Sequence, residues 1–273
     1  MMKKKVMVIS SVLLCALLGG CISQVESGAN KELEIREGVT ATYRGGIVVD
    51  GVFDEWEDVK WRWVDRESGV LDIGTKPLAE HGKDLWFGFA LQCDDDALYV
   101  AVLCYDDALS TDSCEPGSVT GPTWADDTLE LFIDGDHNKA IDSRSKERDE
   151  LRYGGEFALV ANGAACSDYS GYPKTFGLDG YWSGATKVMG NDMDGYLVRY
   201  EVRLPWSVMG GEVGPNSMIG FNISLQDDDD GKGRESALYW KGSEKWPFRN
   251  ESKFGDVYLQ PKPSECSVLG NCK

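Results

Sequence analysis

The chain is built mainly of short apolar runs separated by turn residues. After residue 38 the clearest runs are GGIVVDG, DLWFGFALQ, ALYVAVLCY, TLELFID, GEFALVA, GYLVRYEVRLP, MIGFNISLQ, SALYW and FGDVYL. Runs of this length, bounded by Gly, Asp, Asn and Pro, predict β-strands. Their spacing is typical of an all-β sandwich or barrel. A short helix is indicated only for residues 142–151.

The alternation within each run indicates which face the strand buries. Residues 97–105 (ALYVAVLCY) are apolar on both faces, which predicts a central strand. Residues 196–204 (YLVRYEVRL) and 218–226 (MIGFNISLQ) alternate strictly, which predicts one core face and one polar face. Residues 128–134 (TLELFID) alternate in the same way and place Glu130 on the polar face. We therefore expect at least three strands to direct polar side chains away from the core.

The first twenty residues are predicted to be a removable leader. Three lysines precede the apolar stretch VMVISSVLLCALL, which is too short for a confident membrane span. The following LGGC resembles the lipobox of bacterial lipoproteins, which implies that Cys21 is lipidated and becomes the mature N-terminus. An ordinary secretory signal with a chance cysteine is the alternative. Because Ile22 is not the Asp that retains many lipoproteins at the inner membrane, we expect an outer-membrane or cell-surface location.

Charge and length limit what the mature chain can do. Removing residues 1–20 moves the formal net charge from −18 to −21, because three lysines and no acidic residue are lost. Such an acidic chain repels phosphate backbones, which argues against a nucleic-acid partner. We expect contact with a membrane through the N-terminal lipid alone. The predicted organisation is a lipidated tether (21–38), one sandwich domain (39–260) and a cysteine-containing tail (261–273).

The cysteines fit an exported protein. Beyond the leader and the lipid site, six remain: Cys93, Cys104, Cys114, Cys166, Cys266 and Cys272. Export permits disulfides, and we expect Cys266 and Cys272 to close a small C-terminal loop. The sequence leaves the pairing of the other four open. The absence of CxxC and CxxCH spacings disfavours zinc, redox and c-type haem sites.

Tryptophan is the most informative residue type, with nine in the chain. The sequence places most of them in core or hairpin packing: Trp56, Trp61, Trp63, Trp86 and Trp206. Trp124 and Trp246 differ, because each lies in a polar loop (GPTWADD and SEKWPFRNESKFG). An indole beside carboxylates and amides can stack on a sugar while the polar groups bond its hydroxyls. The alternative is a loop Trp folded back onto the sandwich.

Six segments in order resemble family 9 carbohydrate-binding modules, within the wider DOMON-like sandwiches. They are IVVDGVFDEW, DDDALYVAVLCYDD, WADDTLELFID, YEVRLPWSVM, IGFNISLQDDDDG and WPFRNESKFGDVYL, between about residues 45 and 259. The resemblance implies an antiparallel β-sandwich that binds mono- and oligosaccharides, often at chain ends. It also implies association with glycan-degrading enzymes such as glycoside hydrolases, and often a structural calcium ion.

The resemblance also implies a ligand site in which two indoles enclose a sugar ring and a strand Glu accepts its hydroxyls. The matching residues are Trp124, Trp246, Glu130, Asp127, Asn222, Ser224 and Gln226. The sequence departs from the family pattern at several polar positions. Ala158 or a neighbour replaces an Arg, and Ser224 and Ser243 replace amides. The aromatic platform is thus retained while its hydrogen-bonding rim differs.

Three acidic stretches could supply calcium ligands. Residues 94–96, 134–136 and 227–230 are rich in Asp, although none has EF-hand spacing. One structural Ca²⁺ and a solvated acidic surface are both compatible with this pattern.

The function predicted from the sequence is non-catalytic carbohydrate binding in support of polysaccharide catabolism. A carboxylate-based glycoside hydrolase is one alternative, since two suitably spaced acids would suffice. A structural surface lipoprotein without a ligand is another. A haem-binding DOMON carrier is disfavoured because His81 and His137 both lie in polar loops. No nucleotide-binding motif occurs. The glycan, the partner enzymes and the oligomeric state stay open.

Overall fold

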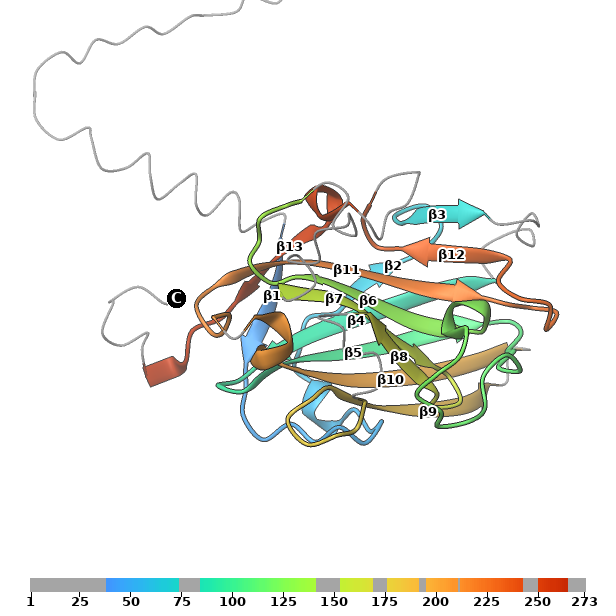
Figure 1. Cartoon of the computed structure of the whole chain (residues 1–273), viewed down its shortest axis with the longest axis horizontal. Helices are drawn as coiled ribbons and strands as arrows, with labels where there is room; N and C mark the ends of the chain where they lie inside the picture. Colours follow the sequence, from blue (N-terminus) through green and yellow to red (C-terminus); the bar gives the residue numbers. More distant parts are fainter. Residues whose placement is uncertain are drawn as a thin grey trace, which may run out of the picture. The chain divides into compact units, whose positions relative to one another are not determined.

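The strands form a β-sandwich whose two sheets are joined along one side (Figure 1). The structure is a computed structural model and describes residues 38–73, 84–140, 153–168, 176–191, 195–210, 212–242 and 250–264. These residues all belong to one unit, Gly38–Lys273. Helical structure within them is short: it includes the 3-10 turns η1 (Asp54–Trp56), η2 (Thr123–Ala125), η4 (Trp206–Met209) and η6 (Glu251–Lys253), and residues 263–264 are α-helical. The predicted all-β sandwich is confirmed.

One sheet, which we call sheet A, carries the strand with Glu130. Its order is β8 (Ala165–Asp168), β7 (Gly154–Val160), β6 (Thr128–Asp134), β11 (Met218–Asp227), β13 (Gly255–Leu259) and the start of β1 (Val39–Tyr43). The C-terminal part of β11 also pairs with β12 (Ser236–Tyr239), and β12 pairs in turn with β3 (Val70–Ile73). The strands β6, β11 and β12 therefore lie side by side where Glu130 is located.

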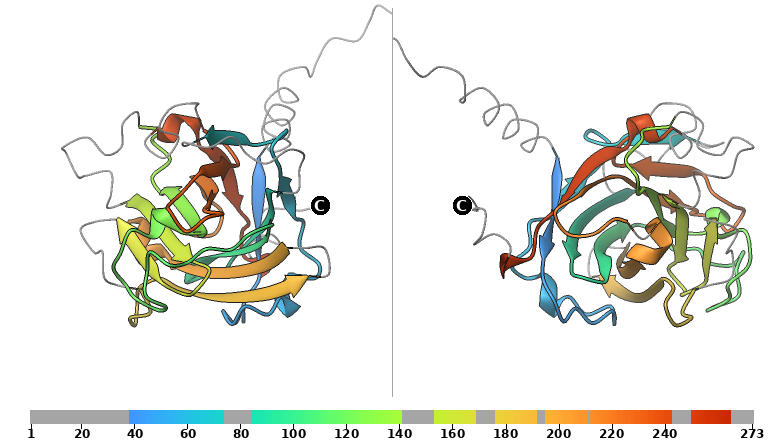
Figure 2. Two further views of the ribbon diagram at one scale, coloured as in Figure 1. Left: turned by 90° about the vertical axis from the view of Figure 1, so that its right-hand side faces the viewer. Right: turned by 60° about the vertical axis from the view of Figure 1, so that its left-hand side comes forward.

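The second sheet, sheet B, is assembled around β5. It comprises the end of β1, β4 (Leu85–Cys93), β5 (Ala97–Asp106), β10 (Gly195–Pro205) and β9 (Ser183–Asn191), with β2 (Arg62–Val64) also paired to β4. Strand β1 pairs with β13 through residues 39–41 and with β4 through residues 42–43. Both pairings are parallel, and the other pairings of the described strands are antiparallel. Figure 2 shows β1, in blue, linking the two layers.

The core lies between the sheets and is filled by the inward residues of the alternating strands. On β6 and β11 these buried residues are Leu129, Leu131, Ile133, Ile219, Phe221, Ile223 and Leu225. Each buried side chain of this size contributes about 1.5–3 kcal/mol through the hydrophobic effect. The opposite face of the same strands therefore has to point away from the core, which confirms the orientation predicted for Glu130.

The segment predicted as a strand at GGIVVDG is instead irregular. Residues 44–53 contain no strand, and Gly46 and Gly51 have positive φ angles of 80° and 76° that favour glycine. Ile47 and Val49 pack with Trp56 against the outer face of sheet B. The apolar alternation thus reflects packing of a covering loop, because a second small core can use the same pattern as a strand.

Several further predictions can be compared with the described residues. Cys93, Cys104 and Cys114 are buried, Cys166 is half-buried, and no disulfide joins these four. The predicted helix at 142–151, the Cys266–Cys272 pair, His81 and Cys21 lie outside the described residues. In the described part of the chain, no helix is both long and apolar enough to cross a membrane.

Candidate functional site

A row of polar side chains crosses the outer face of sheet A. Glu130 on β6 pairs with Ser224 on β11, and Ser224 pairs with Tyr239 on β12. On the other side Glu130 pairs with Ala158 of β7. Because paired residues direct their side chains to the same face, Glu130 faces Ser224 directly. The pairing places small residues on both sides of this carboxylate.

Glu130 belongs to a connected hydrogen-bonded network. Gln226 Nε2 donates to Glu130 Oε2 at 2.6 Å and to Ser224 Oγ at 3.0 Å. Ser224 Oγ donates to the same Glu130 oxygen at 3.4 Å. Arg234 Nη1 donates to Gln226 Oε1 at 2.9 Å, and its Nη2 lies 3.6 Å from Asp72 Oδ2. Carboxylate acceptors and amide or guanidinium donors therefore alternate across the face, an arrangement that can bond adjacent hydroxyl groups.

Aromatic rings form an apolar floor beside this network. The Phe132 ring lies 6.2 Å from Tyr239 and 6.3 Å from Phe254, measured between ring centroids. Burial, and then the negative charge of Glu130, raise the pKa of Tyr239 well above its usual value. The phenol therefore stays neutral and can donate a hydrogen bond. An apolar floor beside charged and neutral polar groups matches the amphipathic surface of a sugar.

Trp124 stands at the entrance to β6 with 57% of its surface exposed. It lies in the short turn η2, which is closed by bonds from Ala125 N to Pro122 O (2.8 Å) and from Asp126 N to Thr123 O (3.3 Å). The Thr128 hydroxyl also donates to Thr123 O. These bonds fix the backbone on both sides of the indole while leaving its ring open to solvent. The alternative of a Trp124 ring folded into the core is excluded.

The other predicted ligand residues have different surroundings. Asp127 is buried and accepts backbone amides of Ser110 and, at 3.0 Å, Asp228. Asn222 is buried and exchanges two bonds with the backbone of Lys241, at 2.8 and 3.0 Å. Both therefore hold loops beside the network, while Glu130, Ser224 and Gln226 come together within it. Trp246 and Ser243 lie outside the described residues.

Three members of the site were missed by sequence reasoning: Asp72, Arg234 and Tyr239. Arg234 belongs to a Gly- and Asp-rich segment, DDDDGKGRES, that is typical of an ordinary solvated loop. Its guanidinium reaches Gln226 only because the chain reverses between β11 and β12. The one signal in the sequence was that an Arg lies in the turn that follows an alternating strand with a polar face.

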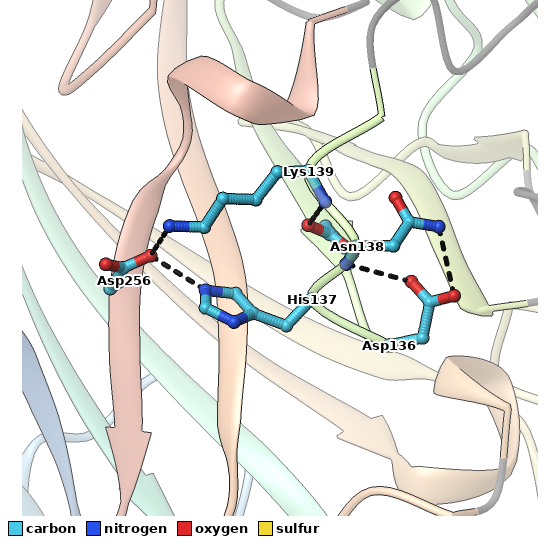
Figure 3. Close-up of polar contacts among 6 residues, drawn as sticks. Asp136, His137, Asn138, Lys139 and Asp256 are labelled. Carbon is cyan, nitrogen blue, oxygen red and sulfur yellow. Dashed lines mark hydrogen bonds and ion pairs between the residues drawn. The ribbon is translucent and has the colours of Figure 1, made fainter.

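The acidic stretch 134–136 forms a turn rather than an open cluster (Figure 3). Asn138 Nδ2 donates to Asp136 Oδ2 at 3.0 Å. His137 Nε2 lies 2.8 Å from Asp256 Oδ1, and Lys139 Nζ lies 3.1 Å from the same oxygen. The turn is thereby tied to β13. Residues 94–96 form a similar turn, in which Asp94 accepts backbone amides of Asp96 and Ala97.

The third acidic stretch, 227–230, joins a larger carboxylate cluster at the ends of four strands. The carboxylates of this cluster come from both sheets and form three overlapping sets, and within each set one oxygen of every residue lies within 4.8 Å of the others. The sets are Asp84, Asp227 and Asp229; Asp106, Asp107 and Asp229; and Asp106, Asp127 and Asp227. Burial raises the pKa of Asp84 and of Asp227 to about 6 and that of Asp127 to about 8. Packing this many acids together is unfavourable unless protons or a cation neutralise them.

Unpartnered carboxylate oxygens also make the cluster suitable for a hard divalent cation. Both oxygens of Asp84 and the Oδ1 oxygen of Asp227 are buried without a hydrogen-bond partner among the described residues. Buried carboxylate oxygens normally have partners, and Ca²⁺ is coordinated by such oxygens. A neighbouring set of Asp112, Asp126 and Asp228 fits less well. Asp126 accepts two backbone amides, and so does Asp228.

Comparison with known proteins assigns this chain to a family. The sequence model of the family described as carbohydrate family 9 binding domain-like matches residues 49–262. The endo-1,4-β-xylanase A of Thermotoga maritima is 27% identical over 224 residues, which cover 81% of this chain and 17% of the xylanase. The exoglucanase XynX of Acetivibrio thermocellus is 24% identical over 229 residues, covering 82% of this chain and 17% of that protein. The chain thus spans about a sixth of the length of these relatives.

Solved structures agree with this relationship at the level of the fold. A family 9 carbohydrate-binding module from Caldicellulosiruptor kristjanssonii in complex with cellotriose superposes with a TM-score of 0.60 at 22% identity, covering 83% of this chain and 95% of that one. The same kind of module in complex with glucose gives a TM-score of 0.59, also at 22% identity, covering 82% and 96%.

Proposed function

Because this chain belongs to the carbohydrate family 9 binding domain-like family, we propose that it holds a sugar at the Glu130 network of sheet A without catalysing a reaction on it. The family's relatives carry the matched region as 17% of a larger xylanase, as expected of a binding module. The observation that supports the site best is the outward-facing Glu130, which accepts hydrogen bonds from the side chains of Gln226 and Ser224. The ligand class is a mono- or oligosaccharide, or the end of a polysaccharide chain.

Each group of the site has a role in this proposal. Trp124 stacks on the C–H face of a pyranose and removes it from water. Glu130 accepts hydroxyl protons, and Arg234 and Gln226 donate to hydroxyl oxygens. The resemblance adds Trp246 as a second ring on the opposite side of the sugar. After ordering and desolvation costs, we expect a Kd from about micromolar to about millimolar, or about −8 to −4 kcal/mol.

Substitution of Trp124 by Ala tests the proposal. The variant should lose measurable binding to glucose, cellotriose and a panel of other mono- and oligosaccharides, measured by calorimetry and tryptophan fluorescence. Trp63→Ala is the matched control, since Trp63 is similarly exposed (52%) but belongs to sheet B. Failure of every sugar to bind the parent chain, or undiminished binding by Trp124→Ala, would refute this site.

A structural calcium ion is the proposed cofactor. Asp84, Asp227 and Asp229 would hold it, with Asp106 and Asp127 close by, and its charge would neutralise the cluster. At a calcium concentration about 100 times Kd the expected gain is about 2.7 kcal/mol of unfolding free energy. This corresponds to a rise in Tm of about 5–10 °C, measured by calorimetry against a chelator-treated sample. Equal melting with calcium, magnesium or chelator would exclude a calcium site.

We also propose that the domain is exported and held at a membrane by a lipid on Cys21, at the outer membrane or cell surface. The support is the lysine-rich leader followed by an apolar stretch and LGGC. In that position it would retain glycans near separate glycoside hydrolases. Mass spectrometry of the mature N-terminus should find a diacylglyceryl-modified cysteine, whereas an unmodified Cys21 would show that the anchor is absent.

A further inference from the structure

The loop between β11 and β12 connects the sugar network to the carboxylate cluster. It begins after Asp227, the last residue of β11, and ends before Ser236, the first of β12. Asp227 and Asp229 belong to the cluster, whereas Arg234, five residues further along, bonds the Gln226 side chain. One short loop therefore carries groups of both sites.

Internal bonds make this loop a single unit. The amide of Asp229 donates to Glu235 Oε2 at 2.6 Å, and the amide of Glu235 donates to Asp227 O at 2.8 Å. The Ser236 hydroxyl donates to Asp227 Oδ2 at 2.7 Å. Asp228 accepts amides from the loop's two glycines at 3.0 and 3.3 Å. Movement of Asp227 or Asp229 would therefore be passed on to the segment that carries Arg234.

The cluster is the part of this unit that needs a cation. Asp84 immediately precedes β4 of sheet B, and neither of its carboxylate oxygens has a hydrogen-bond partner in the described part of the chain. Without a cation, its charge repels Asp227 and Asp229 across the gap between the sheets. With a cation bound, the same three carboxylates are drawn together and the loop is fixed against sheet B.

We infer that binding of a divalent cation by Asp84, Asp227 and Asp229 raises the affinity of the sugar network, because it fixes the loop from which Arg234 orients Gln226. Arg234 then holds Gln226 Oε1, which directs Gln226 Nε2 toward Glu130. This inference rests on the proposed sugar site. Linkage requires that sugar raise the affinity for the cation by the same factor.

The test measures both halves of this coupling on the full chain. Metal is removed with a chelator, and glucose and cellotriose are titrated by calorimetry before and after calcium is added. We expect calcium to tighten sugar binding about tenfold, within the usual range of coupling between two sites. Terbium luminescence, read with and without saturating cellotriose, should show the same factor for the metal. Titrations are done where circular dichroism shows the metal-free chain to be folded, so that unfolding does not imitate coupling.

Two variants separate the two ends of the connection. Asp84→Asn keeps the shape of the side chain but removes its charge, and it should abolish the calcium response of sugar binding. Arg234→Met keeps the length of the side chain but cannot bond Gln226. It should still bind terbium as the parent does, while its sugar affinity no longer changes with calcium.

The possible results separate the coupling from the proposed sugar site and the proposed cation site. Sugar binding that is equally tight with and without calcium would overturn the coupling and leave the sugar site intact. Coupling that persists in Arg234→Met would also overturn it, because the connection would then run elsewhere. Absence of terbium binding would remove the cation site and the inference with it. Absence of binding to both sugars in every condition would instead count against the proposed function.

Discussion

Two glutamates occupy equivalent places in the two sheets and have different surroundings. Glu130 lies in the middle of β6 in sheet A, and Glu201 lies in the middle of β10 in sheet B. Both point away from the core and both are buried, at 4% and 0% exposure. Glu201 accepts the indole N–H of Trp56 at 2.8 Å and the amides of Asp50 and Gly51 at 2.9 and 3.0 Å. Glu130 instead accepts hydrogen bonds from the side chains of Gln226 and Ser224.

A structural carboxylate and a ligand-binding one differ in the donors that they bond. Backbone amides and a buried indole are fixed donors, so Glu201 holds the covering loop onto sheet B and, being fully buried, is closed to a ligand. Side-chain amides and hydroxyls can rotate, so Gln226 and Ser224 can exchange their bonds to Glu130 for bonds to a sugar. The kind of partner, rather than burial or charge, separates the two.

Replacing each of the two glutamates by alanine should give the largest effects on stability and on sugar affinity. Glu201→Ala leaves two buried donors and the part-buried amide of Asp50 without an acceptor, which should lower the free energy of unfolding by about 3 kcal/mol or more. Glu130→Ala removes a charged acceptor of sugar hydroxyls, worth about 1.5–3 kcal/mol, and should weaken cellotriose binding by about 10- to 150-fold. Denaturant unfolding and calorimetric titration of both variants measure the two quantities.

The two glutamates have different roles only if one variant loses mainly stability and the other mainly sugar affinity. Glu201→Gln is the control, because its amide oxygen still accepts one or two of the donors and should restore part of the stability. If Glu130→Ala destabilises the fold as strongly as Glu201→Ala and leaves sugar affinity unchanged, Glu130 is a second structural carboxylate.

Much of the fold could be read from alternation along the chain. The pattern in β6, β10 and β11 predicted the core face and the outer face correctly, because a buried sheet imposes a period of two. It failed for β9 (SGATKVMGN), a polar edge strand that is held mainly by pairing with β10. It also failed at residues 45–51, where an apolar covering loop imitates a strand.

The candidate site was less accessible to sequence reasoning. Glu130 and Trp124 could be located, because a Glu within an apolar strand and a Trp in a polar loop are both locally unusual. Arg234 and Asp72 could not, because their proximity to Gln226 depends on how β3, β12 and the preceding loop fold over β11. Likewise, only the fold shows that Asp84 joins Asp227, residues that are far apart in the sequence.

A smaller effect is expected on the outer face of sheet B at Gly88. The Trp63 ring lies over this glycine, and an added Cβ would approach its Cε3 and Cζ3 atoms to 2.5 Å. Gly88→Ala should therefore displace the exposed indole, at a cost of about 1 kcal/mol in unfolding free energy. The shift is measured from the tryptophan emission maximum together with denaturant unfolding.

Sugar affinity should not change in Gly88→Ala, because Trp63 stacks on Trp61, lies tilted against Trp86 and has no part in the sheet A network. A loss of cellotriose binding in this folded variant would show that the exposed indole of sheet B contributes to recognition. The contrast between the two faces would then have to be abandoned.

The smallest effect is expected for Ser224→Ala within the sheet A network. The bond from Ser224 to Glu130 is long, at 3.4 Å, while Gln226 keeps its own bond to Glu130 at 2.6 Å. Loss of the hydroxyl therefore loosens Gln226 without removing it, and cellotriose affinity should fall about two- to threefold, or about 0.5 kcal/mol. Calorimetric titration of Ser224→Ala beside the parent measures this. A loss above about tenfold would mean that the Ser224 hydroxyl bonds the sugar directly. Ser224 would then not be a partner that Glu130 exchanges for the sugar.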